Sequence, residues 1–580
     1  MLTNGQGGWL ALPNQPECRS NYEGLVLMRP DSGTPCKVIE NIYLDHPIEV
    51  VENHFHSIIR SSGKAKERLV LQGNSVLYRV DNYESFINLD LDCRELYDYS
   101  DQGRTYQIYK QENRLILEYK KYSDASLKKE SYSYYIVIEG IDNFVPVKNW
   151  VRREYVYDKK RKAQSVFYIY QTLRLRCPGK IRLTFTAHPN IEEALKQGKE
   201  VFTNFDQGVR DAELETEERY SSARLLPAIH ALHSLKKNNE GILAGLPWFH
   251  QFWSRDTLVS LHAFTLQSDF DFVKKIFFFY VNQIDENGRL PNRIPSSDLG
   301  CADSVGWLWK RILDYIQVLQ AKNQLAQTLD HADLMMLKQK LDLCLQRLHK
   351  SHMKEGLVLS AAKETWMDTI DRDGARIEIQ ALQLSMYKTA QVLNELTLSY
   401  SEKHAWQEKQ LQEVVRAKFF DGRLADGFAN GKADFTQRPN IFLAYYIYPE
   451  LLSQEKWEQA FDHALQQLWC PWGGLSTLDK NHPDFKAEYT GADNASYHQG
   501  DSWYWINNLA ALSLLRLNKE KYKEFVYKLI EASMNEMLFS GWLGHCAEVS
   551  SASFRTSAGC LAQAWSAATL VELLEEVNKH

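Results

Sequence analysis

The spacing of apolar residues along the chain changes once, between about residues 190 and 210. Before this point, short runs rich in aromatic and β-branched residues alternate with turn residues, which is typical of strands. Strands are predicted over 114–119, 132–138, 152–157, 164–170 and 180–186. Their spacing of roughly 12–20 residues predicts an antiparallel β-sandwich.

After this point the apolar positions recur with the period of an α-helix. Helices are predicted over 223–235, 257–266, 307–320, 332–349, 379–398, 457–469, 503–517, 521–537 and 562–577, with no strong β run between them. This length holds about twelve helices, and six pairs can close into a double ring, an (α/α)6 barrel. The periodicity also fits a helical bundle or a solenoid, although the sequence has no repeat of fixed period. The predicted domains are an N-terminal β-sandwich with its linker over 1–205 and an all-α barrel over 206–580.

The composition is that of a large globular protein. Of the 580 residues, 44% are hydrophobic and 24% charged, and 68 basic against 74 acidic residues give a net charge of −6. A protein that binds a nucleic-acid backbone is basic, so we expect no nucleic-acid partner. The N-terminus has no basic region followed by an apolar run, and no window approaches about 18 consecutive apolar residues. We therefore expect no membrane partner and a cytoplasmic location.

The cysteines indicate neither a disulfide framework nor a metal cluster. There are nine, an odd number, and no two form a C-x-x-C pair. We expect reduced and mostly buried thiols. The sequence has no H-E-x-x-H motif and no Walker-type phosphate loop, so no metal or other cofactor is expected.

Aromatic residues give the first indication of function. They make up 12% of the chain, and of the 15 tryptophans all but Trp9 and Trp150 lie after residue 240. Most stand in polar-aromatic clusters, and flat apolar faces of this kind suit sugar rings. The clusters cover 244–258, 288–309, 364–382, 491–505 and 545–565.

Each cluster also has a structural interpretation when taken alone. Arg255 beside Asp256 can hold a hydroxyl from two sides, or form an ion pair that caps a helix. Glu378, at the apolar start of a helix, is either a buried working carboxylate or an exposed partner of the helix dipole. His498 is more often a hydrogen-bonding residue than a catalytic base, and Glu548 stands where a solvated loop acid is common.

Taken together and in order, these segments resemble the C-terminal, amylo-α-1,6-glucosidase part of glycogen debranching enzymes. The similar segments are AGLPWFHQFWSRDTLVSL (244–261), GRLPNRIP (288–295), TWMD (365–368), IEIQAL (377–382), RPN (438–440), PWGGLSTL (471–478) with HPDF (482–485), YHQG with W-Y-W (497–505) and GCLAQAWS (559–566). GGWLALPN and SNYEGLVL, near the N-terminus, are similar to the β-domain that precedes this module in bacterial and archaeal members.

The resemblance implies an (α/α)6 barrel and an inverting glycoside hydrolase that removes the glucose held by an α-1,6 bond at a trimmed branch point. By motif, Asp368 takes the role of general acid and Glu548 that of general base. Arg255 and Asp256 would hold the outer hydroxyls of the glucose. The implied stacking walls are Trp248, Trp253, Trp309, Trp366, Trp503 and Trp505. The implied polar contacts are Asn292, Arg293, Glu378, Gln380, Tyr497, His498 and Gln499.

Three departures from the family pattern bear on specificity. The Asp that often precedes the Leu-Trp pair is absent, and Asp303 lies two positions away. The base loop, usually similar to S-E-I-F-D, reads AEVSS over 547–551, and G-T-V-W-P-W reads GDSWYW over 500–505. Asp501 is thus an additional carboxylate that would change leaving-group preference or compete for the role of base.

Three functions therefore stay open. The first is an exo-acting α-glucosidase on glycogen-like or short branched α-glucans. The second is a glucoamylase-like α-1,4-glucosidase or a trehalase-like hydrolase, since fold does not decide between them. The third is a glucan-binding protein without activity, against which the retention of both Asp368 and Glu548 argues. The β-rich N-terminal region leaves no room for the transferase barrel of the large bifunctional enzymes.

Overall fold

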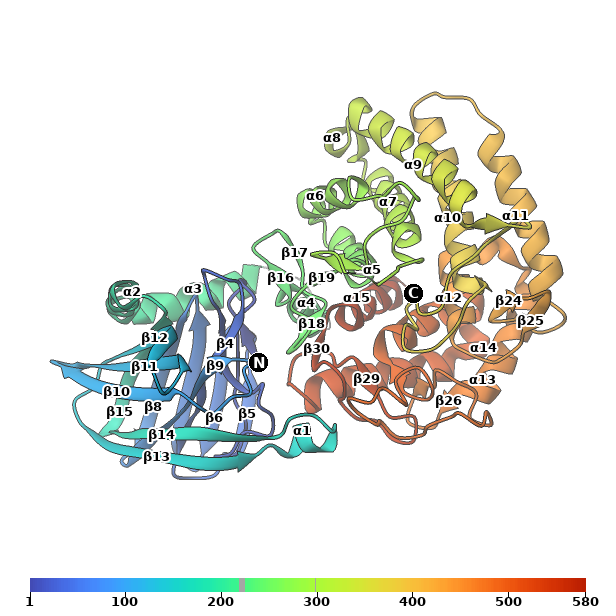
Figure 1. Ribbon diagram of the computed structural model, residues 1–580. Coiled ribbons are helices and arrows are strands. Elements are labelled where there is room, and N and C mark those ends of the chain that lie inside the picture. The colour runs from blue at the N-terminus through green and yellow to red at the C-terminus, as the bar shows by residue number, and fades with distance from the viewer. Residues whose placement is uncertain (219–224, 298, 580) are drawn as a thin grey trace. The chain divides into compact units, whose positions relative to one another are not determined.

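The computed structural model describes residues 1–218, 225–297 and 299–579. The chain forms two compact units, one comprising Met1–His230 with Trp542–Gly544, the other Ala231–Gly541 with His545–His580 (Figure 1). The predicted division lay between residues 205 and 206. Helices α2 (Ile191–Thr203) and α3 (Phe205–Glu218) both belong to the first unit.

The first unit is built on two large antiparallel sheets. One has the strand order β1-β2-β3-β4-β9-β14-β13 and the other β10-β11-β12-β15-β8-β7-β6-β5. Their bounds are β1 Leu2–Thr3, β2 Trp9–Ala11, β3 Gly24–Met28, β4 Pro35–Leu44, β5 Val50–Asn53, β6 Ile58–Ser62, β7 Ala65–Gln72, β8 Ser75–Tyr83, β9 Phe86–Glu95, β10 Arg104–Gln111, β11 Arg114–Asp124, β12 Lys129–Glu139, β13 Phe144–Glu154, β14 Val166–Arg176 and β15 Gly179–His188.

The core of this unit lies between the two sheets. Alternate side chains of a strand point to the same face, so Leu89 and Leu91 of one sheet share a cluster with Ile136 and Ile138 of the other. Helices α2 and α3 cover the opposite face of the second sheet. Ala194 of α2 packs on Ile116 and Val137, and Phe205 of α3 packs on Val70 and Leu77.

Four of the five predicted strands coincide with β11, β12, β14 and β15. The fifth, predicted over 152–157, is only partly correct. Strand β13 ends at Glu154, and Val156–Lys160 form the short helix α1. Asp158 is buried there and accepts hydrogen bonds from Ser20 Oγ and Asn21 N, which holds the chain in a turn.

The second unit contains a closed ring of helices. Its members are α5 (Ser254–Leu266), α7 (Ser304–Ala321), α10 (Ile377–Leu396), α12 (Asn440–Ile447), the first part of α14 (Tyr504–Phe539) and α15 (Ala564–Lys579). Each packs against the next, and α15 packs against α5. The chain thus has the predicted architecture, antiparallel sheets followed by an (α/α)6 barrel.

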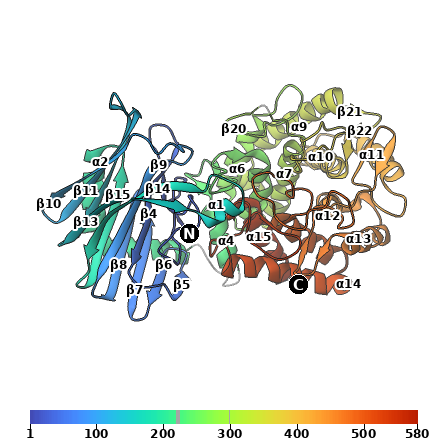
Figure 2. The same ribbon diagram turned by 60° about the horizontal axis from the view of Figure 1, so that its bottom comes forward.

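An outer layer of helices surrounds this ring. It comprises α6 (Phe270–Val281), α9 (His331–His352), α11 (Lys403–Phe419), α13 (Gln454–Leu468) and the part of α14 beyond a kink at Asn518. In the view of Figure 2, α9, α11 and α13 lie outside α10 and α12. The remaining helical segments are α4 (Leu226–His233), α8 (Leu325–Thr328) and the 3-10 turn Pro449–Leu451.

The predicted helices correspond to observed ones, although residues 223 and 224 of the first lie outside the described residues. Helices α2, α3, α6, α8, α11 and α12 were not predicted. Every residue of α12 is buried, and those after Asn440 are apolar or aromatic on all sides, so the helix has no amphipathic period. The helices predicted over 503–517 and 521–537 form the two parts of α14. Their junction is Asn518, with φ −159° and ψ 91°.

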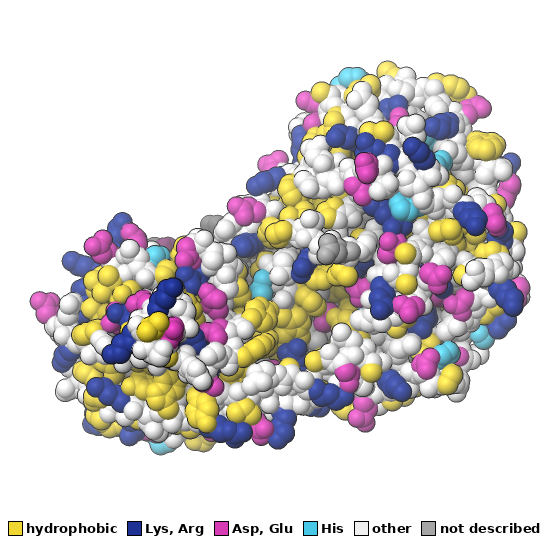
Figure 3. All heavy atoms as spheres, viewed as in Figure 1, with side chains coloured by type: hydrophobic (Ala, Val, Ile, Leu, Met, Phe, Trp, Pro, Cys, Tyr) yellow, Lys and Arg dark blue, Asp and Glu magenta, His cyan; other side chains and the backbone are white. Residues whose placement is uncertain are grey.

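The cysteines and the charged surface agree with what the composition indicates. All nine cysteines are buried thiols, and none of them takes part in a disulfide. On the face drawn in Figure 3, acidic and basic side chains are interspersed on the helical unit. Within the described ranges, no helix combines the length and apolar character needed to cross a membrane.

Candidate active site

Short strand pairs join the loops that precede the inner helices. No β structure was expected here, and these strands are only two or three residues long. The pairs are β18 (Gly245–Leu246) with β30 (Ala562–Gln563), β19 (Phe252–Trp253) with β20 (Arg293–Ile294), β23 (Ala375–Arg376) with β24 (Gly427–Ala429), and β28 (Ser502–Trp503) with β29 (Val549–Ser550). Because each pair links neighbouring loops, the five sequence clusters gather at one end of the ring.

Asp368 lies beside a buried arginine. Arg255, in the first turn of α5, donates from Nε to Asp303 Oδ2 at 2.7 Å. Its Nη1 lies 3.7 Å from Asp368 Oδ2. Burial raises the pKa of Asp368 to about 6, against the opposing charge of Arg255 and with support from Asp303. The Asp368 side chain still has 31% of its surface exposed, so its carboxyl group remains within reach of a ligand.

Asp256 has a different partner from its neighbour Arg255. Helix α5 begins at Ser254, so Asp256 stands in the first turn and not at the N-cap. Its Oδ1 accepts a hydrogen bond of 2.9 Å from Gln563 Nε2, across two loops. Burial raises its pKa to about 8, Arg255 opposes the shift, and Glu548 and Asp368 add to it. The Arg255–Asp256 ion pair considered as an alternative does not form, because each side chain bonds to another loop.

Glu548 is buried and receives two hydrogen bonds. Tyr497 donates its hydroxyl proton to Oε1, and Cys560 N donates to Oε2 at 2.9 Å. Burial and the adjacent Glu548 raise the pKa of Tyr497 well above its usual value, so Tyr497 keeps its proton and donates it. At Gly559, with φ +66°, a Cβ atom would lie 2.3 Å from Glu548 Oε2, so the carboxylate needs a glycine at this position.

Five of the predicted residues form one aromatic cluster, in which Tyr497 contacts His498 and Trp503 with ring centres 4.9 and 4.6 Å apart. His498 stacks on Trp503 with ring centres 5.0 Å apart, and Trp366 meets His498, Trp503 and Trp505 edge-on at 5.3 to 5.5 Å. Trp565, which was not predicted as a site residue, stacks on Trp505 at 4.5 Å.

His498 is connected to the loop that carries Asp368, residues 360–374, which we call the acid loop. Its Nδ1 pairs with Thr369 Oγ1 at 2.7 Å, one residue beyond Asp368. Burial, with Arg438 close by, lowers the pKa of His498 well below its usual value. The imidazole is therefore uncharged and only a weak proton acceptor, which fits a hydrogen-bonding residue better than a general base.

Glu378 and Gln380 hold the protein's own loops. Arg372 donates to Glu378 at 2.8 Å and also to Asp426, while Gln380 bonds to both N and O of Val358. These contacts fix the two ends of the acid loop. Arg372 and Asp426 were missed by the sequence analysis, although Asp426 also accepts from Asn440 of the RPN segment.

The remaining predicted residues are more dispersed. Trp253 is half-buried under the guanidinium of Arg293, 5.7 Å from its ring centre, and Trp248 is also half-buried. Asn292 is buried, and Gln499 accepts a hydrogen bond from Arg438 at 3.0 Å. Trp309, on α7, is completely buried.

Asp501 lies in the interior and is 0% exposed. Ser496 Oγ donates to its Oδ2 at 2.8 Å. Burial raises its pKa to about 7, the Ser496 bond opposes the shift and Glu548 adds to it. The described residues contain no group of three or more His, Cys, Asp or Glu side chains arranged to hold a metal ion.

The chain is similar to a protein family in sequence and to solved structures in fold. A family model described as amylo-alpha-1,6-glucosidase matches residues 216–572. A crystal structure of a bacterial glucoamylase complexed with acarbose superposes on the whole chain, covering 94% of the glucoamylase, with a TM-score of 0.67 and 12% sequence identity. A mannosylglycerate hydrolase of family GH63 from Thermus thermophilus covers 59% of this chain and 98% of its own, with a TM-score of 0.46 and 13% identity.

Proposed function

Because the chain belongs to the amylo-alpha-1,6-glucosidase family, a family of glycoside hydrolases, we propose that it releases glucose from α-1,6-linked stubs on glycogen-like or short branched α-glucans. We propose further that it does so with inversion at the anomeric carbon. Asp368 is the general acid and Glu548 the general base.

The observation that carries this proposal is the contrast between the two carboxyl groups. Burial raises the pKa of Asp368 to about 6, which keeps a proton on the group at mildly acidic pH. Glu548 instead accepts hydrogen bonds from Tyr497 and Cys560, and such bonds stabilise the charged form that a base needs. Pairs of carboxyl groups with such different surroundings are typical of acid–base catalysis.

Asp256 also has a raised pKa, but it fits the role of acid less well. Its side chain is buried and is already bonded to Gln563. Asp368 is the more exposed of the two and does not share a hydrogen bond with Arg255 at 3.7 Å. Asp256 and Arg255 are better placed to hold the hydroxyls of the terminal glucose.

In the proposed reaction, Asp368 donates its proton to the glycosidic oxygen while Glu548 removes a proton from an attacking water molecule. Arg255 then stabilises the carboxylate that Asp368 becomes. Inversion calls for the two carboxyl groups to stand about 6.5–9.5 Å apart, with the sugar and the water between them. No covalent glycosyl-enzyme forms.

Two measurements test this proposal. Product analysis on phosphorylase-limit dextrin, beside isomaltose-type, maltose-type and trehalose substrates, decides the linkage. Release of glucose from maltose or trehalose but not from limit dextrin would replace the debranching assignment. NMR of the anomeric proton in the first minutes should show β-glucose, and early α-glucose would overturn both the mechanism and the placement of the acids.

A further inference from the structure

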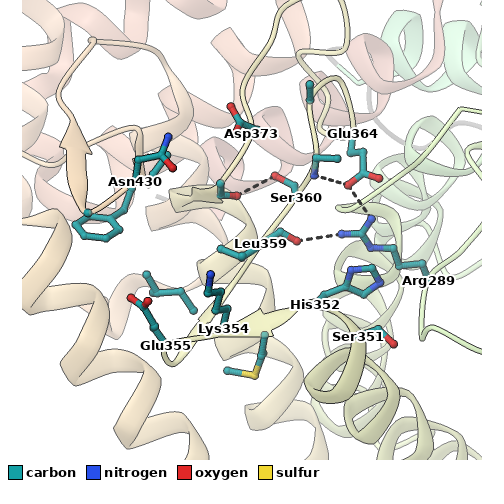
Figure 4. A pocket seen from close by; sticks show the side chains of 18 residues that line it. Arg289, Ser351, His352, Lys354, Glu355, Leu359, Ser360, Glu364, Asp373 and Asn430 are labelled. Atoms are coloured by element: carbon teal, nitrogen blue, oxygen red, sulfur yellow. Dashed lines mark hydrogen bonds and ion pairs between the residues drawn. The ribbon is translucent and has the colours of Figure 1, made fainter.

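The helical unit holds a cavity beside the loop that carries Asp368. Its volume is about 860 Å³, near the upper end of the range in which proteins hold small ligands. It lies between the hairpin of β21 (Met353–Lys354) and β22 (Leu357–Val358) and the turn of the β24–β25 hairpin (β25 Lys432–Asp434). Figure 4 shows Arg289, Ser351 and His352 on one side of it and Asn430 on the other.

The acid loop forms part of the wall of this cavity. Ser360 and Gly374 exchange two backbone hydrogen bonds of 2.9 Å, which close the loop at its base. Between them, Glu364 and Asp373 line the cavity, while Asp368 belongs to the candidate active site. A general acid protonates the oxygen of the leaving group, so the loop that carries it borders the part of the substrate that departs.

The lining is polar but has no excess of positive charge. Arg289 is neutralised by Glu364, which it binds at 2.7 Å, and Lys354 stands next to Glu355. Burial lowers the pKa of His352, so its imidazole is uncharged near neutral pH. A phosphate or nucleotide site would hold surplus cations. Hydroxyl and amide groups beside Leu357, Leu359 and Phe428 suit an uncharged polyhydroxyl chain.

We propose that this cavity is a second carbohydrate site, which binds an unbranched α-1,4-linked segment of the leaving glucan. The inference rests on the proposed function, because it assumes an α-glucan substrate. The volume accommodates more than one hexose ring, so the cavity holds a run of the chain. Binding there positions the polymer so that its stub reaches Asp368.

The test fills the cavity without touching the proposed catalytic groups. Ala362 is exposed and lines the cavity, and Ala362→Trp places a large ring within it. Ala332→Trp, at an exposed position in the first turn of α9, is the matched control. A milder pair is Asn430→Gly and Asn323→Gly, since both asparagines are exposed and have positive φ, 51° and 55°, which glycine accepts.

Binding of maltoheptaose is measured by titration calorimetry with the active site saturated by 1-deoxynojirimycin. We expect the wild type and Ala332→Trp to bind it, Ala362→Trp to lose at least about tenfold in affinity, and Asn430→Gly to lose less. Equal binding by Ala362→Trp and its control, or no binding by the wild type, overturns the proposal. Hydrolysis of limit dextrin is measured separately. If the wild type hydrolyses limit dextrin but does not bind maltoheptaose, only the second site is rejected. If it binds maltoheptaose but does not hydrolyse limit dextrin, the proposed function is rejected.

Discussion

Two aspartates, one in each unit, lie beside arginines and have opposite protonation behaviour: Asp92 is completely buried, whereas Asp368 is half-buried. In the β-sheet unit, Asp92 receives hydrogen bonds from Arg94 at 2.8 Å and Arg104 at 2.7 Å, with Lys37 at 3.9 Å. Burial alone would raise its pKa, but these three cations lower it to about 2. In the barrel, burial prevails over the single Arg255 at 3.7 Å and raises the pKa of Asp368 to about 6.

The difference lies in how the cations are shared. Arg255 donates to Asp303 and to Cys301, so Asp368 has a neighbouring positive charge but receives no hydrogen bond from Arg255, which lies 3.7 Å away. A buried carboxylate with its full set of charged donors is fixed in one state and serves the fold. One whose donors are engaged elsewhere can take up and release a proton near neutral pH, which is what acid catalysis needs.

The largest expected effect is the loss of proton transfer in the barrel. Asp368→Asn should lower turnover by about 10²–10⁴-fold with folding intact, the usual scale for a general acid. Glu548→Gln should be similarly severe. Steady-state kinetics on limit dextrin, with circular dichroism as a check of folding, measure both. Turnover of Asp368→Asn within tenfold of wild type removes Asp368 from the role of acid.

The matching change in the β-sheet unit should affect stability and not chemistry. Asp92→Asn removes the buried counter-charge of Arg94 and Arg104, which keep Asp101 at 3.8 and 3.3 Å. The free energy of unfolding should fall by about 3–5 kcal/mol. Since the folded pKa lies below the ordinary 3.8, the wild-type contribution is present above pH about 4 and is lost as the pH falls toward about 2. Denaturant titration at pH 7 and pH 3 measures this, and an unchanged midpoint at pH 7 contradicts it.

A smaller effect is expected from a change that lowers the pKa of Asp368 part of the way toward that of Asp92. Asp303→Asn removes a carboxylate that raises the pKa of Asp368 and frees Arg255 to approach it. The acid must be protonated to act, so kcat/KM falls as the pH rises through its pKa. This alkaline limb should move to lower pH by about one unit, the scale of a single neighbouring charge. A pH profile of kcat/KM shows the shift, and a limb that stays in place or moves to higher pH contradicts the assignment.

The sequence predicted the two units better than the contacts that distinguish them. Strands such as β11 and β12 are rich in aromatic and β-branched residues and were recognised, whereas α12 is buried all round and has no period to recognise. Asp368 and Glu548 were identified only because short motifs resemble a known family. The partners that set their chemistry could not be predicted from spacing, because Arg255 and Asp303 are 48 residues apart and Asp256 and Gln563 are 307 apart.

The smallest expected effect concerns Asp501, the additional carboxylate of the sequence. It is completely buried and held by Ser496, so Asp501→Asn should keep turnover within about tenfold of wild type, and a collapse of activity would transfer the role of base to Asp501. Its folded pKa of about 7 lies above the ordinary 3.8, so ionising it costs stability increasingly as the pH rises from about 4 to 7. Asn cannot ionise and still accepts the Ser496 bond. Thermal unfolding should therefore show Asp501→Asn gaining stability relative to wild type at pH 8 compared with pH 4, and a gain confined to pH 4 would show that the carboxylate is stabilised by its surroundings.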